Sequence, residues 1–148
     1  MSDLKSRIQQ DLTTAMKARQ QREVSAIRLI TAAIKQQEVD QRITADNNLI
    51  TDILVKLAKQ RRESITHYQQ AGRDDLVEQE QYELALIETY LPQPLTESEI
   101  DGLVQHALSE TKATSVKDMG AVMAILKSEI HGRADMGQVS NKVKQALA

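Results

Sequence analysis

A basic, glycine-bearing turn in the last third of the chain is the strongest candidate for binding chemistry. It runs from His131 to Gly137, between two segments with helical periodicity. Gly132 is the type of residue that ends a helix and Asp135 the type that caps the next one, so we expect Arg133 beside the unpaired amides of a helix N-terminus. Such an end attracts anions, including phosphates. The alternative is a tight connection between helices, in which Asp135 itself supplies the anion.

Residues on either side would enlarge a positive surface around this turn. Lys127, Lys142 and Lys144 are close in sequence, and Gly137 leaves the backbone of the last helix open to close approach. Gly120, in the preceding helix, has alanine neighbours. Small residues of this kind also allow two helices to pack closely, which is a structural explanation for them.

The chain shows no constellation of side chains suited to catalysis. It has no cysteine, which excludes thiolate nucleophiles, disulfides and thiolate metal sites. His67, His106 and His131 fall in three different segments and lack the spacing of metal ligands. Glycine-rich phosphate loops and the nucleophilic serine motif are also missing. We therefore predict no catalytic residue, no metal and no cofactor.

Helical periodicity runs through the whole sequence and predicts an all-α protein. The only aromatic residues are three tyrosines, so the core must be aliphatic, which suits helix packing. Apolar residues spaced three or four apart mark the buried face of each expected helix. Met16, Leu29 and Val116 are among the residues that this spacing assigns to buried faces.

Local residue types also predict where the helices begin and end. Asp46 or Asn47 is expected to cap a long third helix that stops at Gly72, and Asp74 or Asp75 to cap the helix that follows.

Two prolines predict the division of the chain into domains. Pro92 and Pro94 cannot continue a helix. Beyond them, Thr96 and Glu99 form a capping box that opens a new helix. We expect a helical N-terminal domain over residues 1–91 and a small three-helix bundle over residues 96–148.

One charged residue interrupts the apolar face of the long third helix. Arg61 occupies an apolar position there, and Glu80 does so in the fourth helix. If Gly72 turns the chain back, the two helices run antiparallel and Arg61 lies within about one turn of Glu80 or Glu83. We predict an ion pair that fixes the register of the helices, because a buried charge without a partner is costly.

Charge is unevenly distributed along the chain. The net charge is −2, yet residues 112–148 hold six basic and three acidic residues. Residues 73–101 hold one basic residue and nine acidic ones. The acidic segment could bind a basic partner or pair with basic helices of the same chain, and the basic end could meet an anionic partner.

The sequence also bears on cellular location. No apolar run approaches the ~18 residues of a membrane span. The first residues lack the basic-then-apolar layout of a secretory signal. These features predict a soluble cytoplasmic protein that does not enter membranes.

Five motifs carry a resemblance to a known family. They are Lys59–Ser64, Ala71–Leu76, Tyr90–Leu95, Lys117–Met123 and Gly132–Asp135. In this order and spacing, the chain resembles the stand-alone YqeY-like members of the GatB/YqeY family over essentially its whole length. The last two motifs are similar to the tail domain of the B subunit of glutamyl/aspartyl-tRNA amidotransferase, whose kinase-like cradle domain has no equivalent here.

The resemblance implies a function connected with tRNA. In the amidotransferase, a carbon–nitrogen ligase with glutamine as amido donor, the tail contacts tRNA. We therefore expect a non-catalytic tRNA-binding protein, or an accessory of a tRNA-modifying or aminoacylating enzyme. The residues expected to contact phosphates through their charge are Lys117, Lys127, Arg133, Lys142 and Lys144, and Gly120 and Gly137 are expected to permit the close approach of the nucleic acid.

Two other functions compete with tRNA binding. The chain could be a protein-interaction module that uses the acidic residues 73–101. An amidase or amidotransferase activity, suggested by the family name, lacks any catalytic constellation in this sequence.

Overall fold

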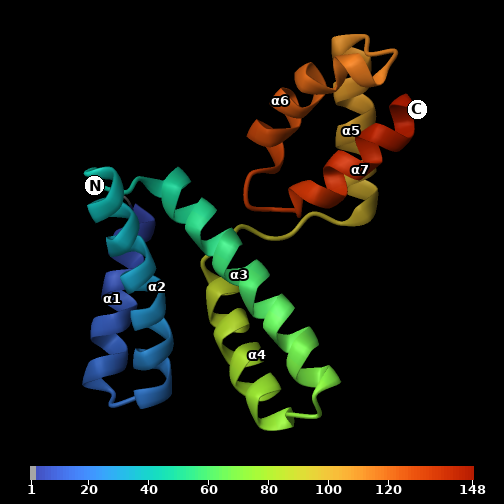
Figure 1. Ribbon diagram of the computed structural model, residues 1–148. Coiled ribbons are helices and arrows are strands. Elements are labelled where there is room, and N and C mark those ends of the chain that lie inside the picture. Colours follow the sequence, from blue (N-terminus) through green and yellow to red (C-terminus); the bar gives the residue numbers. More distant parts are fainter. Residues whose placement is uncertain (1–2) are drawn as a thin grey trace. The chain divides into compact units, whose positions relative to one another are not determined.

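The computed structural model describes residues 3–148, and every regular element in that range is a helix (Figure 1). The α-helices are α1 (Asp3–Lys17), α2 (Gln21–Gln41), α3 (Asn47–Gln70), α4 (Asp74–Thr89), α5 (Glu97–Thr111), α6 (Met119–Ile130) and α7 (Met136–Leu147), with a short 3-10 helix, η1 (Val116–Asp118), before α6. The prediction of an all-α protein is confirmed. Over the same residues, no helix is both long enough and apolar enough to cross a membrane.

The helices form two compact units. The N-terminal unit extends up to Leu91 and the C-terminal unit is Pro92–Ala148. Each unit buries its own cluster of apolar side chains. The assignment of residues 1–91 and 96–148 to two domains stays a prediction.

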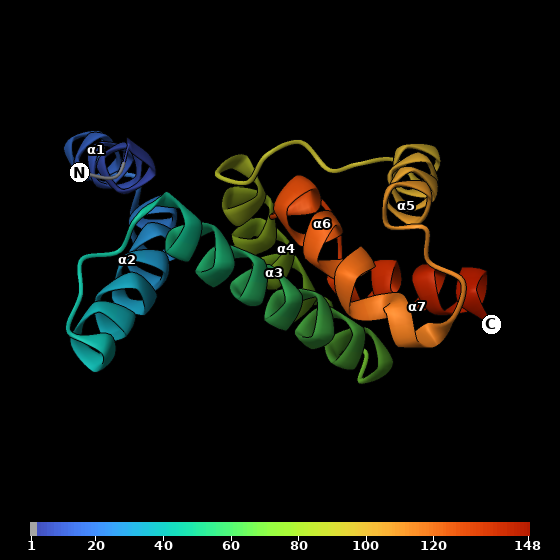
Figure 2. The same ribbon diagram turned by 90° about the horizontal axis from the view of Figure 1, so that it is seen from above.

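The N-terminal unit consists of two helical hairpins, α1–α2 and α3–α4. Helices α3 and α4 run side by side in both views (Figures 1 and 2). The fully buried residues of α3 run from Ile50 to Ala58, in its first half, where they join the core formed with α1 and α2. The long helix therefore joins one hairpin to the other.

The core of this unit is aliphatic apart from one tyrosine. Its buried residues are Ile8, Ala15, Val24, Ile27, Ile30, Ile34, Ala45, Ile50, Ile53, Leu54, Ala58, Ile87 and Tyr90. The Tyr90 hydroxyl donates to Oδ2 of Asp11 at 2.6 Å, and the Arg7 guanidinium lies 4.9 Å from the centre of the Tyr90 ring. Burial, followed by the hydrogen bond to Asp11, raises the pKa of Tyr90 well above its usual value.

Local chemistry explains the start and end of α3, but one predicted cap is wrong. Asp46 caps α3, and its Oδ1 accepts from the Leu49 amide at 2.8 Å. After the helix ends, Gly72 has a φ of +70°, a conformation that glycine adopts without strain. The N-cap of α4 is Arg73, whose side chain makes no capping hydrogen bond, so the prediction of Asp74 or Asp75 as the cap is wrong. These two carboxylates lie in the first turn of α4, where the helix dipole favours them.

The C-terminal unit is built from α5, α6 and α7, which contact one another pairwise. The capping box of α5 forms as predicted: the Glu99 amide donates to Oγ1 of Thr96 at 3.1 Å, and the Thr96 amide to Oε1 of Glu99 at 3.3 Å. The buried residues are Ile100, Val104, Ala107, Val122, Leu126, Ile130, Val139, Val143 and Leu147.

Three large apolar residues expected in buried faces are exposed instead. Met16 is 50%, Leu29 46% and Val116 51% exposed, so their assignment to the core is wrong. Helical spacing identifies a stripe, but the neighbouring helices decide how much of its width is covered. Val116 lies in η1, whose tighter turn takes it off the face that α6 buries.

Candidate nucleic-acid interface

The turn between α6 and α7 is held by bonds of its own. Gly132 has a φ of +75°, and the Arg133 amide donates to the Ile130 carbonyl at 2.7 Å. Nε of Arg133 donates to the Gln93 carbonyl at 3.1 Å, while the Arg133 carbonyl accepts from the Leu95 amide at 2.8 Å. Arg133 therefore fastens the segment before α5 to this turn, and its Nε is not available to an anion.

The N-terminus of α7 carries its own anion. Asp135 caps the helix, and its Oδ1 accepts from the Gly137 amide at 2.9 Å. A Cβ added to Gly137 would lie 3.3 Å from the same oxygen, so the small residue leaves room for the cap. Of the two interpretations of the turn, a self-capped helix connection is the one that this geometry matches.

Lys142 is also engaged within the C-terminal unit. Its Nζ lies 2.8 Å from Oδ1 of Asp101 and 3.6 Å from Oε2 of Glu97, both on α5. The hydrogen bond to Asp101 raises the pKa of Lys142. This lysine joins α7 to α5, and its charge is already balanced.

The remaining lysines of the predicted set are free. Lys117, Lys127 and Lys144 are exposed, and none has an ion-pair partner among the described residues. Gly120 is exposed as well, and a Cβ added there would meet nothing within 4 Å. Gly120 and Lys127 are seven residues apart, so they lie on one face of α6. The alanine neighbours of Gly120 are exposed too, so this small-residue surface serves no helix packing in the C-terminal unit.

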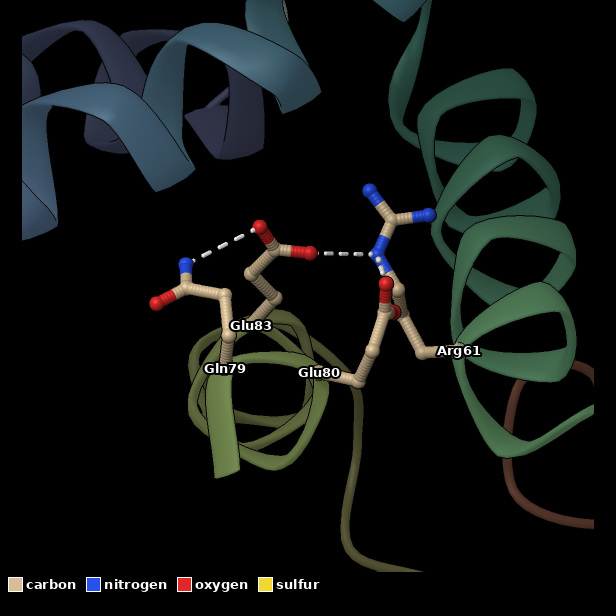
Figure 3. Close-up of polar contacts among 4 residues, drawn as sticks. All are labelled: Arg61, Gln79, Glu80 and Glu83. Atoms are coloured by element: carbon tan, nitrogen blue, oxygen red, sulfur yellow. Dashed lines mark hydrogen bonds and ion pairs between the residues drawn. The ribbon is translucent and has the colours of Figure 1, made fainter. Parts of the chain in front are cut away.

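The structure brings Arg61, Glu80 and Glu83 together between α3 and α4 (Figure 3). Nε of Arg61 lies 2.9 Å from Oε2 of Glu83 and 3.6 Å from Oε2 of Glu80. Oε1 of Glu83 also accepts a hydrogen bond from the side-chain amide of Gln79 at 3.2 Å. The buried Oε2 of Glu80, in contrast, has no hydrogen-bond partner in the described part of the chain. Burial and then the charge of Glu83 raise the pKa of Glu80, and Arg61 opposes them.

Most of the acidic segment 73–101 is neutralised by the chain itself. Seven of its nine acidic residues form ion pairs with basic residues of their own unit: Asp75, Glu78, Glu80, Glu83, Glu88, Glu97 and Asp101. The strongly negative stretch of sequence is therefore not a strongly negative surface.

The histidines stay apart in the fold. His67 lies in α3, His106 in α5 and His131 directly after α6. Within residues 3–148, no three His, Asp or Glu side chains come together in a way that could hold a metal ion.

Comparison with known proteins identifies the family. The family model described as "Yqey-like protein" matches residues 5–147, nearly the whole chain. The chain therefore belongs to the YqeY-like family, as its motifs predicted.

Similar proteins include fungal relatives named "Altered inheritance of mitochondria protein 41, mitochondrial". The one from Eremothecium gossypii is 42% identical over 91 residues, 61% of this chain and 50% of the relative. The one from Pyrenophora tritici-repentis is 36% identical over 145 residues, 95% of this chain and 79% of the relative. The one from Lachancea thermotolerans is 35% identical over 116 residues, 76% of this chain and 62% of the relative.

These comparisons bear on how much of each relative the chain covers and on the cellular location. The matched region spans about half the length of the Eremothecium relative and under two thirds of the Lachancea one. The names of these relatives describe mitochondrial proteins, which overturns the prediction of a cytoplasmic location.

Proposed function

We propose that this YqeY-like chain is a non-catalytic RNA-binding protein whose C-terminal unit contacts tRNA through Lys117, Lys127 and Lys144. The observation that supports the proposal is the exposure of these three lysines without ion-pair partners in the described structure. Arg133, Lys142 and Gly137, which sequence reasoning placed in the same set, instead hold the unit together.

The chemistry of this surface suits a phosphate backbone. Free lysines on a surface attract phosphates and release their counterions, which favours binding at low salt. Around Gly120, the exposed face of α6 lacks bulky side chains, so that a nucleic-acid backbone can approach the helix closely. Aromatic platforms for base stacking are absent from residues 92–148, and the binding is expected to depend on charge and shape rather than on sequence.

The choice of tRNA rests on the motifs at Lys117–Met123 and Gly132–Asp135. Their similarity to the amidotransferase tail supports a tRNA ligand and an accessory role beside a tRNA-dependent amidotransferase or aminoacyl-tRNA synthetase. In this proposal the chain supplies binding, and the partner enzyme supplies the chemistry.

A triple variant tests the proposal. We expect Lys117→Gln, Lys127→Gln and Lys144→Gln together to weaken tRNA binding at low salt by about tenfold or more. Three phosphate contacts also change the dependence of log affinity on log salt by roughly 2–3 units, so the slope should become shallower by that amount. Fluorescence anisotropy with labelled tRNA over a range of salt concentrations measures both.

A matched triple variant in the N-terminal unit provides the control. Lys17, Lys56 and Lys59 are exposed and have no ion-pair partner in residues 3–148, so Lys→Gln changes there remove the same charge. This control should keep the affinity and the slope. Failure of the parent protein to bind tRNA at low salt, or equal losses in both triple variants, would show that the assignment is wrong.

The interaction-module hypothesis has less support. Only Asp74 and Glu99 of the acidic segment lack an ion pair within the described residues, and Glu99 is used in the capping box of α5. A basic partner would have to displace the chain's own arginines and lysines.

A further inference from the structure

A groove between α1 and α2 collects basic side chains that the tRNA proposal does not use. It has a volume of about 440 Å³, within the range of small-ligand sites. Three basic residues line it, Lys5, Arg28 and Lys35, against a single acidic one, Glu38. All of these belong to the N-terminal unit.

The one carboxylate that lines the groove, Glu38, already accepts hydrogen bonds from its own unit. Oε2 of Glu38 accepts from Nζ of Lys5 at 2.7 Å and from the Ala45 amide at 2.8 Å. The hydrogen bond from Lys5 is the main cause that lowers the pKa of Glu38, so this carboxylate stays ionised beside its lysine. Three basic residues against one acidic residue give the groove a net charge of +2, and the charge of Lys35 is only the last of the causes that lower the pKa of Glu38.

Arg28 and Lys35 are placed to share one ligand. They are seven residues apart on α2, so they project from the same face, about 10 Å apart along the helix axis. Both are exposed, and neither side chain has a hydrogen bond or ion pair within the described range. The residue midway between them on that face is the short Ala32, which leaves space for a ligand.

The opposite wall of the groove supplies a neutral donor. Gln9 on α1 is exposed, and its side-chain amide has no partner among residues 3–148. A guanidinium, an ammonium and an amide group thus line one space, above the apolar side chains of Ile8 and Ile34.

We infer that this groove binds a phosphate group. A phosphate carries up to two negative charges and at least three acceptor oxygens, which matches the two free cations and the amide. A carboxylate has two oxygens and a single charge, and would leave one of these donors unused. No aromatic side chain lines the groove, so it offers no stacking surface for a base. The phosphate can come from a small phosphate monoester, or from two neighbouring phosphodiesters of an RNA backbone, which together supply two charges and four free oxygens.

Inorganic phosphate is the probe for the site. In a titration of the ¹⁵N-labelled full chain at constant ionic strength, with chloride as reference salt, we expect saturable shifts of the amides around Gln9 and across Arg28–Lys35. Arg28→Gln with Lys35→Gln should weaken this binding by about tenfold or more, because charge-assisted hydrogen bonds are lost. Lys56→Gln with Lys59→Gln, two exposed lysines of α3 outside the groove, should leave it unchanged.

The same variants distinguish the source of the phosphate. If a short single-stranded RNA shifts the groove amides and loses affinity in Arg28→Gln/Lys35→Gln, the phosphate belongs to RNA. If only inorganic phosphate shifts them, the ligand is a small phosphate ester. Shifts that never saturate, or equal weakening in both double variants, would overturn the site. The lysines of α6 and α7 are intact in these proteins, so this result is independent of the test of tRNA binding.

Discussion

The guanidinium of Arg61 lies near two carboxylates, but its contact with one of them is closer than with the other. Glu83 receives a hydrogen bond from Arg61 and another from Gln79, whereas Glu80 lies farther away with a buried oxygen that has no donor. Both oxygens of Glu83 thus have hydrogen-bond donors, and Glu80 bears the cost of burial. The two positions should respond to substitution in opposite ways.

We predict that Glu83→Gln lowers the free energy of unfolding at pH 7 by about 1–2 kcal/mol, because a charge-assisted bond to Arg61 is lost. Glu80→Gln should be neutral or stabilising at the same pH. The pKa of Glu80 is raised in the folded state, so its contribution to stability is full below its unfolded pKa and is lost as the pH rises through the folded pKa. The gain from Glu80→Gln should therefore grow between pH 4 and pH 7.

Urea unfolding of the two variants at both pH values measures these differences. Equal destabilisation by Glu80→Gln and Glu83→Gln at pH 7 would contradict the unequal roles.

Gly120 allows folding and binding to be separated at a single position. An added Cβ meets nothing, so Gly120→Ala should raise the stability of the C-terminal unit by up to about 1 kcal/mol, through the higher helix propensity of alanine. If RNA approaches α6 at this point, the same methyl group should weaken tRNA binding.

Gly102 in α5 is the matched control, because an added Cβ there also meets nothing. Gly102→Ala should stabilise the fold and leave the tRNA affinity unchanged. Thermal melts and anisotropy titrations on both variants give the comparison, and identical affinities would place Gly120 outside the interface.

At the scale of elements, the turn between α6 and α7 is a fastening point for the segment before α5. Two bonds, from Nε of Arg133 to Gln93 and from the Leu95 amide to the Arg133 carbonyl, tie regions about forty positions apart in sequence. Only one of these bonds depends on the side chain.

We therefore expect Arg133→Ala to lower the stability of the C-terminal unit by about 1 kcal/mol and to leave tRNA affinity nearly unchanged. Lys127→Ala should weaken tRNA binding and leave the stability nearly unchanged, since the Lys127 side chain is exposed and without an ion pair in the described chain. Chemical denaturation and binding on the same two proteins measure the contrast. A loss of tRNA binding in Arg133→Ala without a loss of stability would return Arg133 to the interface.

Sequence patterns predicted these elements where the determining contacts are local. The contacts that begin or end a helix join residues only a few positions apart, so residue type and spacing are enough to predict them. Examples are the cap at Asp46, the turn at Gly72 and the capping box of α5. The approach of Arg61 to Glu83 was predictable because one tight turn connects their helices.

Contacts between segments far apart in the sequence could not be predicted from residue type and spacing. Lys142 looked like a free base, but Asp101 neutralises it from 41 residues away. Arg28 and Lys35 belong to no motif in the sequence, although their seven-residue spacing places them on one face of a helix. Their significance depends on α1, which supplies the other wall of the groove.

At the scale of the whole molecule, the distribution of charge matters more than its total. The chain has a net charge of −2, but internal ion pairs consume most of the acidic segment and leave lysines and arginines free on both units. A protein with a low net charge can therefore still present basic surfaces to an anionic partner.

Each unit has its own apolar cluster, so we predict that the smaller, C-terminal unit folds without the rest of the chain. A fragment spanning Pro92–Ala148 should fold alone into a helical bundle of modest stability, given its small size. Far-ultraviolet circular dichroism should show high helicity and a cooperative thermal transition. A fragment without helical signal would mean that the unit needs residues before Pro92.

The placement of the tyrosines has a practical spectroscopic consequence. Tyr68, Tyr82 and Tyr90 all belong to the N-terminal unit, and the chain has no tryptophan. Intrinsic fluorescence therefore originates from one unit alone, and the bond between Tyr90 and Asp11 makes that emission sensitive to its unfolding. Because circular dichroism reports on both units, recording the two signals in one melt separates their transitions without any label.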